Sequence, residues 1–178
     1  MPSFGDDKAE LLIVGLAPGV TGANRTARPF TGDYAGDLLY GTLEKFGWSK
    51  GTYDARPDDG LSLKRAMITN AVRCVPPENK PIGAEINECR RYLTARIKAL
   101  PKLKVIMALG GIAHNSTVRA LDGKLKDYKF GHATRYEIGG YSFISSYHCS
   151  RYNTNTKRLT TEMFENVFIL IDEELGRS

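Results

Sequence analysis

The stretch Leu11–Gly19, LLIVGLAPG, decides how this chain folds and where its chemistry is expected. Its apolar first half, Leu11–Val14, is typical of a buried strand, and the glycines and proline that follow predict a loop. The loop leads to Phe30 and Asp33, just before a run with helical apolar spacing, Tyr34–Phe46. An aromatic ring, a carboxylate and a tight turn at a strand end could form a pocket for a flat polar ring. A glycine-rich first loop is, however, also common in α/β proteins without such a pocket.

The remaining apolar runs predict three more buried strands and several helices. Strands are expected at 66–72, 105–109 and 141–146, and helices at 34–46, 84–100, 112–121 and 160–175. A further short run, 134–138, precedes the last strand across two glycines, and 124–134 is a basic segment that contains His132. Strands that alternate with helices are typical of a parallel sheet covered on both faces.

The loops with unusual composition all follow predicted strands. They are 15–33, 70–80, 110–111 and 148–155. Ligands of parallel sheets bind beyond the carboxyl ends of the strands, so we expect these loops to form one site.

The composition is that of an ordinary globular protein, with 42% hydrophobic and 25% charged residues. No apolar run approaches the roughly 20 residues of a membrane span, and the first residues do not resemble a signal peptide. We therefore expect a cytoplasmic protein that makes no membrane contact. The net charge of +5 slightly favours a polyanionic partner such as DNA, although the basic residues are spread along the chain.

The three cysteines, Cys74, Cys89 and Cys149, are too few for a disulfide framework. Cys74 and Cys89 lie close in sequence, but two thiolates cannot complete a four-ligand zinc or iron–sulfur site. From chemistry alone, unpaired thiols are the favoured interpretation.

The donor-rich segment His148–Thr156 follows the last predicted strand. A histidine at a strand end can donate to a carbonyl oxygen or to a developing anion, or it can be a surface residue of a polar loop. A phosphatase-type cysteine loop is excluded because Asn155 stands where an arginine would be needed. The sequence also contains no P-loop, dinucleotide fingerprint or serine nucleophile elbow.

Taken together, the motifs resemble those of the family 5 (B-type) uracil-DNA glycosylases. The matching segments are GLAPG at 15–19, NRTARPFTGD at 24–33, TNAVRCVPPENKP at 69–81, ALGGIA at 108–113 and SYHCSRYNTNT at 146–156. The resemblance runs from Pro2 to Leu175. It implies one α/β domain over residues 1–178, with three layers, α/β/α, and a short central parallel sheet of four strands. It also implies a monomer that excises uracil, and often other deaminated or oxidised bases, from DNA.

The resemblance assigns roles that the chemistry of the residues suits. Phe30 would stack on the flipped base, and Asn70 would pair with its polar edge. His148 would donate to the uracil oxygen as charge develops there. Asp33 would orient water, because Ala17 or Pro18 occupies the place where other branches carry an acid or amide; capping the next helix is its alternative role. The other substrate-binding candidates are Gly15, Leu16, Ala17, Gly19 and Asn79, and the expected DNA-gripping residues are Ser150, Arg151 and Asn153.

Members of that family typically carry four cysteines that ligate a 4Fe-4S cluster, and Cys74 and Cys89 match the second pair. The first pair precedes the first strand, but the ten residues before Leu11 include no cysteine. Either the N-terminal segment is truncated relative to the family, or the protein dispenses with the cluster.

Two other classes of function stay open at this point. The chain could bind uracil-containing or damaged DNA without catalysis, or it could be a small-molecule enzyme on a flavodoxin-like scaffold. A monofunctional glycosylase is the leading hypothesis, since the motifs contain no evident Schiff-base lysine.

Overall fold

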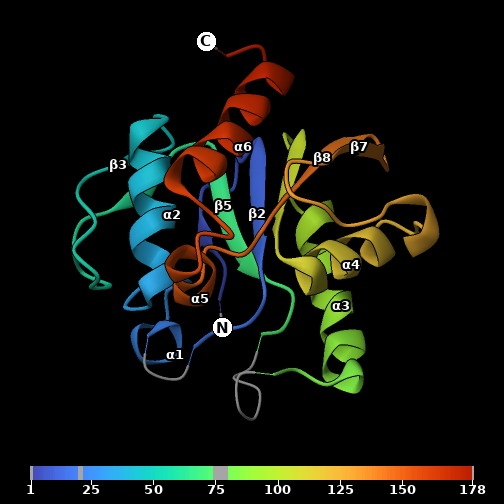
Figure 1. The fold of residues 1–178 in the computed structure, drawn as a ribbon, viewed down its shortest axis with the longest axis horizontal. Helices are drawn as coiled ribbons and strands as arrows, with labels where there is room; N and C mark the ends of the chain where they lie inside the picture. Colours follow the sequence, from blue (N-terminus) through green and yellow to red (C-terminus); the bar gives the residue numbers. More distant parts are fainter. Residues whose placement is uncertain (1, 20–21, 74–79, 178) are drawn as a thin grey trace.

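A computed structural model describes residues 2–19, 22–73 and 80–177, and places a six-stranded sheet at the centre of the molecule (Figure 1). The strand order is β1-β5-β2-β6-β8-β7. The four inner strands are parallel: β5 (Ala66–Asn70), β2 (Leu11–Gly15), β6 (Val105–Leu109) and β8 (Tyr141–Ser146). This confirms the predicted parallel centre. At the two edges, β1 (Phe4–Gly5) and β7 (Arg135–Ile138) pair antiparallel with their neighbours.

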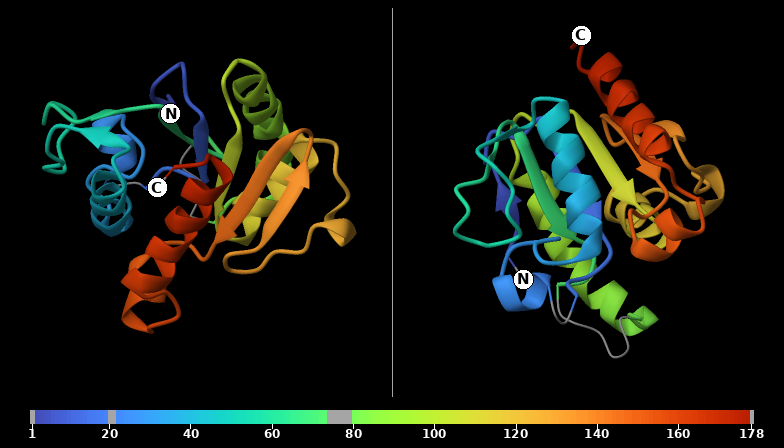
Figure 2. Two further views of the ribbon diagram at one scale, coloured as in Figure 1. Left: turned by 90° about the horizontal axis from the view of Figure 1, so that it is seen from above. Right: turned by 60° about the vertical axis from the view of Figure 1, so that its left-hand side comes forward.

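Helices cover both faces of the sheet, because side chains alternate along each buried strand. Leu11 and Ile13 point into one core, which α2 (Tyr34–Lys45) and α6 (Thr161–Glu174) complete. Leu12 points into the other core, together with side chains of two more helices. Those helices are α3 (Gly83–Lys98) and α4 (Gly111–Ala120). The views in Figure 2 show the resulting three layers, as predicted.

The shorter elements lie in the connections. They are α1 (Ala23–Thr26), the small antiparallel pair β3 (Ser49–Lys50) and β4 (Ser62–Leu63), the 3₁₀ turn η2 (Leu125–Asp127) and α5 (Arg151–Asn155). The short helix α5 was not predicted, since its segment was interpreted as a loop. It forms because the hydroxyl of Ser150 accepts a hydrogen bond from the amide of Asn153 and so caps the helix.

The order of the strands positions the site. β5 pairs with β2 on one side and β6 pairs with it on the other, so the chain reverses its direction of winding at β2. Such a switch point leaves a crevice at the carboxyl end of the strand. Among the described residues, no helix is long and apolar enough to cross a membrane.

Candidate active site

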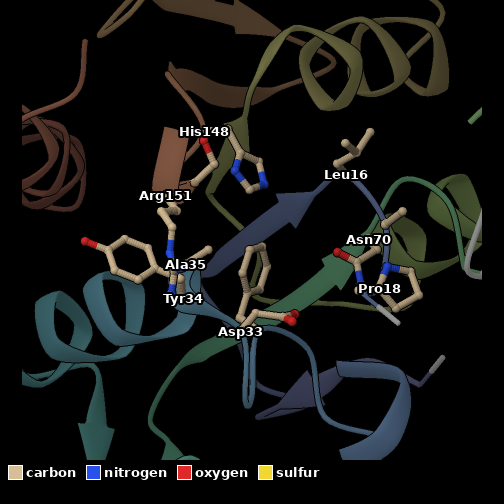
Figure 3. A pocket seen from close by; sticks show the side chains of 12 residues that line it. Leu16, Pro18, Asp33, Tyr34, Ala35, Asn70, His148 and Arg151 are labelled. Atoms are coloured by element: carbon tan, nitrogen blue, oxygen red, sulfur yellow. The ribbon is translucent and has the colours of Figure 1, made fainter. Parts of the chain in front are cut away.

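A cavity of about 240 Å³ lies at the carboxyl ends of the central strands (Figure 3). Its lining comes from three of the four loops that were expected to form one site, 15–33, 70–80 and 148–155. The fourth, Gly110–Gly111, lines a separate cavity together with Leu16 and His148. The lining residues are Leu16, Ala17, Pro18, Gly19, Phe30, Asp33, Tyr34, Ala35, Asn70, His148, Ser150 and Arg151. In Figure 3, Asp33 and Asn70 lie across the cavity from His148.

Phe30 contributes the aromatic side of the cavity. Its φ of 60° places it in the left-handed region, which costs an L-residue about 1–2 kcal/mol. The hydroxyl of Tyr53 holds this conformation, since it donates to the Phe30 carbonyl (3.4 Å) and accepts from the amide of Gly32 (3.3 Å). Backbone strain of this kind persists only where several surrounding contacts hold the conformation in place, and such positions are often found at functional sites.

A buried ion pair anchors the same loop. Arg28 donates two hydrogen bonds to Asp59, at 2.9 and 2.8 Å, and its Nε donates to the hydroxyl of Thr31 at 2.6 Å. The guanidinium holds the pKa of Asp59 well below its usual range. Neither partner was predicted as a site residue: Arg28 stands in the matching motif, whereas Asp59 lies in a loop without any distinctive signal.

Asn70 forms the end of β5 and lies at the floor of the cavity. The side chain is buried, with 5% of the residue exposed, and its Oδ1 atom has no hydrogen-bond donor among the described residues. A Cβ atom at Gly15 would come within 2.6 Å of both this oxygen and the Phe30 ring. Gly15 therefore makes room for the two side chains that would contact a bound base.

Asp33 occupies the N-cap position of α2, but its side chain does not cap the helix. The carboxylate instead accepts a hydrogen bond from the amide of Ala23 at 3.3 Å and lies against Gly19 and Gly22. Partial burial raises the pKa of this carboxyl group. The helix-capping alternative is therefore wrong, and the side chain of Asp33 contributes to the lining of the cavity instead.

His148 follows β8 and lies on the opposite side of the cavity, with its ring centroid 6.0 Å from that of Phe30. Burial lowers the pKa of the imidazole to about 4, so the ring is neutral at pH 7. Within the described part of the chain, no hydrogen bond fixes the ring itself. Its main chain is held instead, because the carboxamide of Asn153 donates to the His148 carbonyl at 2.9 Å. Asn153 was expected to contact DNA, but its carboxamide thus already donates one hydrogen bond within the loop.

The edge of the cavity carries an arginine and a tyrosine, Arg151 and Tyr34, and an exposed tyrosine follows Arg151 in the sequence. The guanidinium of Arg151 lies 4.9 Å from the ring centroid of Tyr34, as Figure 3 shows from the side. Tyr152, the next residue, is 73% exposed. Tyr152 was not predicted as a site residue, although an aromatic residue within a donor-rich segment was a usable signal.

The cysteines lie away from this cavity. Cys89 is buried on α3, and it lines a separate hollow with Val72 and Glu88. Cys149 is also buried, and burial raises the pKa of its thiol to about 12. The described residues contain no group of three or more His, Cys, Asp or Glu side chains that could hold a metal ion, so by themselves they do not fit a four-cysteine cluster. Cys74 and Asn79 lie outside the described residues.

Comparison with known proteins gives a consistent result. The model of the uracil DNA glycosylase superfamily matches residues 2–171. A type-5 uracil-DNA glycosylase of Thermus thermophilus is 42% identical over 170 residues, which cover 95% of this chain and 77% of that protein. One from Pyrobaculum aerophilum is 35% identical over 167 residues, covering 94% and 73%, and one from Mycobacterium tuberculosis is 40% identical over 172 residues, covering 94% and 64%.

Proposed function

Because the chain belongs to the uracil DNA glycosylase superfamily, we propose that it removes uracil from DNA by hydrolysing the N-glycosidic bond and so begins base excision repair. A base within a duplex is inaccessible, so the target nucleotide must first be flipped out of the helix, at a cost of a few kcal/mol. The C1′–N1 bond then breaks, water adds to C1′ and loses a proton, and uracil leaves as an anion that takes up a proton.

The observation that carries this proposal is the buried Oδ1 atom of Asn70, which has no hydrogen-bond partner in the part of the chain that the structure describes. A buried acceptor without a donor costs free energy, which a ligand with a matching N–H would recover. Uracil offers such a donor at N3, and its O4 can accept from the Asn70 amide. Cytosine has no hydrogen on N3 and would place a lone pair against Oδ1. Asn70 therefore favours uracil over the normal base from which it arises.

Phe30 supplies the second contact to the base. Its ring lies next to Asn70 across Gly15, so a pyrimidine that pairs with the amide can stack on the ring. Stacking of a base on an aromatic side chain contributes roughly 1–3 kcal/mol. The loop residues Leu16, Ala17 and Gly19 border the same space.

His148 stabilises the leaving group. The neutral imidazole can donate an N–H to the uracil oxygen without being a strong acid, and this hydrogen bond strengthens as negative charge develops. A donor in a buried site needs little reorganisation during the reaction, so we expect His148 to contribute more than any other single side chain.

Asp33 acts on the sugar. Its carboxylate lies across the cavity from His148, where it can orient the attacking water and offset the positive charge on the oxocarbenium-like sugar. Among the described residues, the amide of Ala23 donates to one carboxylate oxygen only, and the other can hold the water.

The rim would hold the DNA. Arg151 can contact a phosphate while it packs on Tyr34, and Ser150 lies beside it. We infer that exposed Tyr152 enters the space left by the flipped base, as apolar wedges do in other DNA-bending proteins. The described residues of one chain supply the base-binding and catalytic side chains assigned above, which supports a monomer with one domain over residues 1–178. Such an enzyme acts where the chromosome lies, which is the cytoplasm in bacteria and archaea.

The family resemblance implies a 4Fe-4S cluster held in part by Cys74 and Cys89. Cys89 lies on α3 and does not line the catalytic cavity, so we assign it no step of the reaction.

The test is release of uracil from a labelled duplex with one U·G pair under single-turnover conditions, with alkali to reveal abasic sites. The wild type should release uracil, and His148→Ala should lower the rate by roughly 10²–10³-fold, as loss of a donor to a developing oxyanion does. Asp33→Ala should also lower the rate. Asp37→Ala, in the first turn of the same helix, is the matched control and should leave it unchanged.

Tight binding by the wild type without release of uracil or any other deaminated base would overturn the proposal. The chain would then be a binder of damaged DNA. Release by both wild type and His148→Ala at equal rates would instead remove only the assigned role of His148.

A further inference from the structure

His132 is a partly buried histidine outside the cavity, and both of its ring nitrogens are hydrogen-bonded to the main chain. Nε2 lies 3.1 Å from the carbonyl oxygen of Met163, and Nδ1 lies 3.1 Å from the amide nitrogen of Tyr147. The ring also packs on that of Tyr147, with centroids 5.0 Å apart. His132 therefore connects the first turn of α6 to the residue that precedes His148.

The two hydrogen-bond partners determine the tautomer of the His132 imidazole. A carbonyl oxygen can only accept, so Nε2 carries the hydrogen, and an amide can only donate, so Nδ1 is the unprotonated acceptor. Burial, which lowers the pKa of this imidazole, favours the same neutral form. Only one tautomer thus satisfies both contacts.

The contact with Tyr147 lies directly after the last residue of β8, Ser146. Within the sheet, Leu109 pairs with Ser146, and the amide of Gly110 donates to the Ser146 carbonyl at 2.8 Å. On the other side, the amide of Ala133 donates to the Ser145 carbonyl at 2.7 Å. The next amide is that of Tyr147, and the side chain of His132 takes the place of a strand carbonyl as its acceptor.

This matters because His148 is positioned through its main chain. Among the described residues, its ring has no hydrogen-bond partner, and its carbonyl is held by Asn153 alone. The hydrogen bond from the Tyr147 amide to His132 adds a second restraint. It holds the Ser146–Tyr147 peptide group, one residue before His148, while Asn153 holds the peptide group after His148. Between them, the hydroxyl of Ser146 donates to the Tyr147 carbonyl at 2.8 Å. Errors of about 1 Å in the placement of a reacting group can cost 10²-fold in rate.

We propose that His132 is a positioning residue for the glycosylase reaction, which holds the end of β8 so that the imidazole of His148 meets the uracil oxygen. The inference rests on the proposed function, since it assigns His132 an effect on the leaving-group step. His132 does not touch the base, so it should affect the rate of bond cleavage and leave DNA binding nearly unchanged.

Two substitutions separate its two hydrogen bonds. In His132→Asn, the amide oxygen can take the place of Nδ1 and still accept from Tyr147, while the bond to Met163 is lost. In His132→Gln, the amide nitrogen can take the place of Nε2 and still donate to Met163, while the bond to Tyr147 is lost. Each variant loses one hydrogen bond, so a purely structural role predicts similar losses of stability and similar rates.

The experiment measures the single-turnover rate of uracil release, the Kd for the duplex and the melting temperature of both variants. We expect His132→Gln to lower the rate roughly tenfold at an unchanged Kd, and His132→Asn to stay within about twofold of the wild type. In a His148→Ala background, His132→Gln should cause no further loss, because it acts through the missing imidazole. Equal rates in the two variants, or a further loss in that background, would overturn the inference.

A measurement on the wild type keeps the test valid if His132→Gln does not fold. The Tyr147 amide should be protected in native-state hydrogen exchange, and exchange at the rate of a free amide would overturn the inference. Failure of the proposed function is distinguishable, since it would appear as a wild type that releases no uracil at all.

Discussion

Arg28 and Asp59, thirty-one positions apart in the sequence, form a bidentate ion pair whose side chains are only 6% and 1% exposed. Asp59 also accepts hydrogen bonds from the amides of Asp54 and Leu61, at 2.8 and 3.0 Å. The carboxylate therefore joins the loop that carries Phe30 to the connection between β3 and β4.

Asp59→Asn should destabilise the protein strongly. The substitution leaves the buried guanidinium of Arg28 without its counter-charge, which typically costs 3–5 kcal/mol when one partner of a buried pair is removed, so we expect a loss of about that size. Urea denaturation measures the free energy of unfolding. Glu88→Gln, which removes an exposed ion pair with Arg91, is the control and should change it by less than about 1 kcal/mol. Equal effects of the two substitutions would contradict the anchoring role.

Gly15→Ala should abolish uracil release and leave the fold largely intact. The new Cβ would lie 2.6 Å from the Asn70 oxygen and from the Phe30 ring, so both side chains must move out of the position that receives the base. We expect a loss of roughly 10²-fold or more in single-turnover rate. Gly41→Ala, on α2 with no atom within 4 Å of the added carbon, should keep the full rate and stabilise the helix by about 0.5–1 kcal/mol. A fully active Gly15→Ala variant would argue against the assigned base pocket.

The pH dependence of bond cleavage should follow Asp33. His148 has a pKa of about 4 and stays neutral above about pH 5, whereas the Asp33 carboxylate, whose pKa is raised by burial, protonates as the pH falls. The single-turnover rate should therefore rise with pH through the pKa of Asp33 and then stay level to about pH 8. Asp33→Asn should lower the single-turnover rate on the plateau and remove the rise of the rate with pH below it. A fall in the rate as the pH rises past about 6.5, where an unperturbed histidine titrates, would show instead that a protonated imidazole takes part.

Tyr152→Ala should slow uracil release from duplex DNA more than from single-stranded DNA. A wedge residue compensates for lost stacking in a duplex, and a single strand has far less stacking to lose. We expect roughly a tenfold loss with duplex and about a twofold loss with single strand. Ile169→Ala, another exposed apolar side chain, lies on α6 and serves as the control. Equal losses on both substrates would point to a general binding contact instead.

Much of the fold was predictable because its strands are buried on both faces. The runs 11–15 and 105–109 are fully buried, and their apolar sequences indicate this directly. The main helices begin and end within about two residues of the predicted positions, since each carries a clear apolar face. The edge strand β1 is only two residues long, too short for any periodicity to be visible. The family resemblance, based on motifs in separate loops, is confirmed by the superfamily match.

The site was predictable as a set of residues but not as a set of contacts. Phe30, Asp33, Asn70 and His148 line one cavity, because parallel strands present their carboxyl ends at one edge. Pairings between distant segments, such as His132 with Tyr147, depend on distances that no local pattern encodes. The sequence likewise places Asp33 at a helix N-terminus but does not show that its carboxylate faces away from the helix.

The left-handed backbone of Phe30, held by Tyr53, has a consequence for the end of the catalytic cycle. A receptor whose shape is fixed before the substrate arrives keeps that shape after the bond is broken. The released base therefore meets the same stacking surface and the same amide as the target nucleotide did, without the strain of a bent duplex. Free uracil should accordingly occupy the empty enzyme and compete with the next lesion, so that turnover is governed by departure of the base as well as of the DNA.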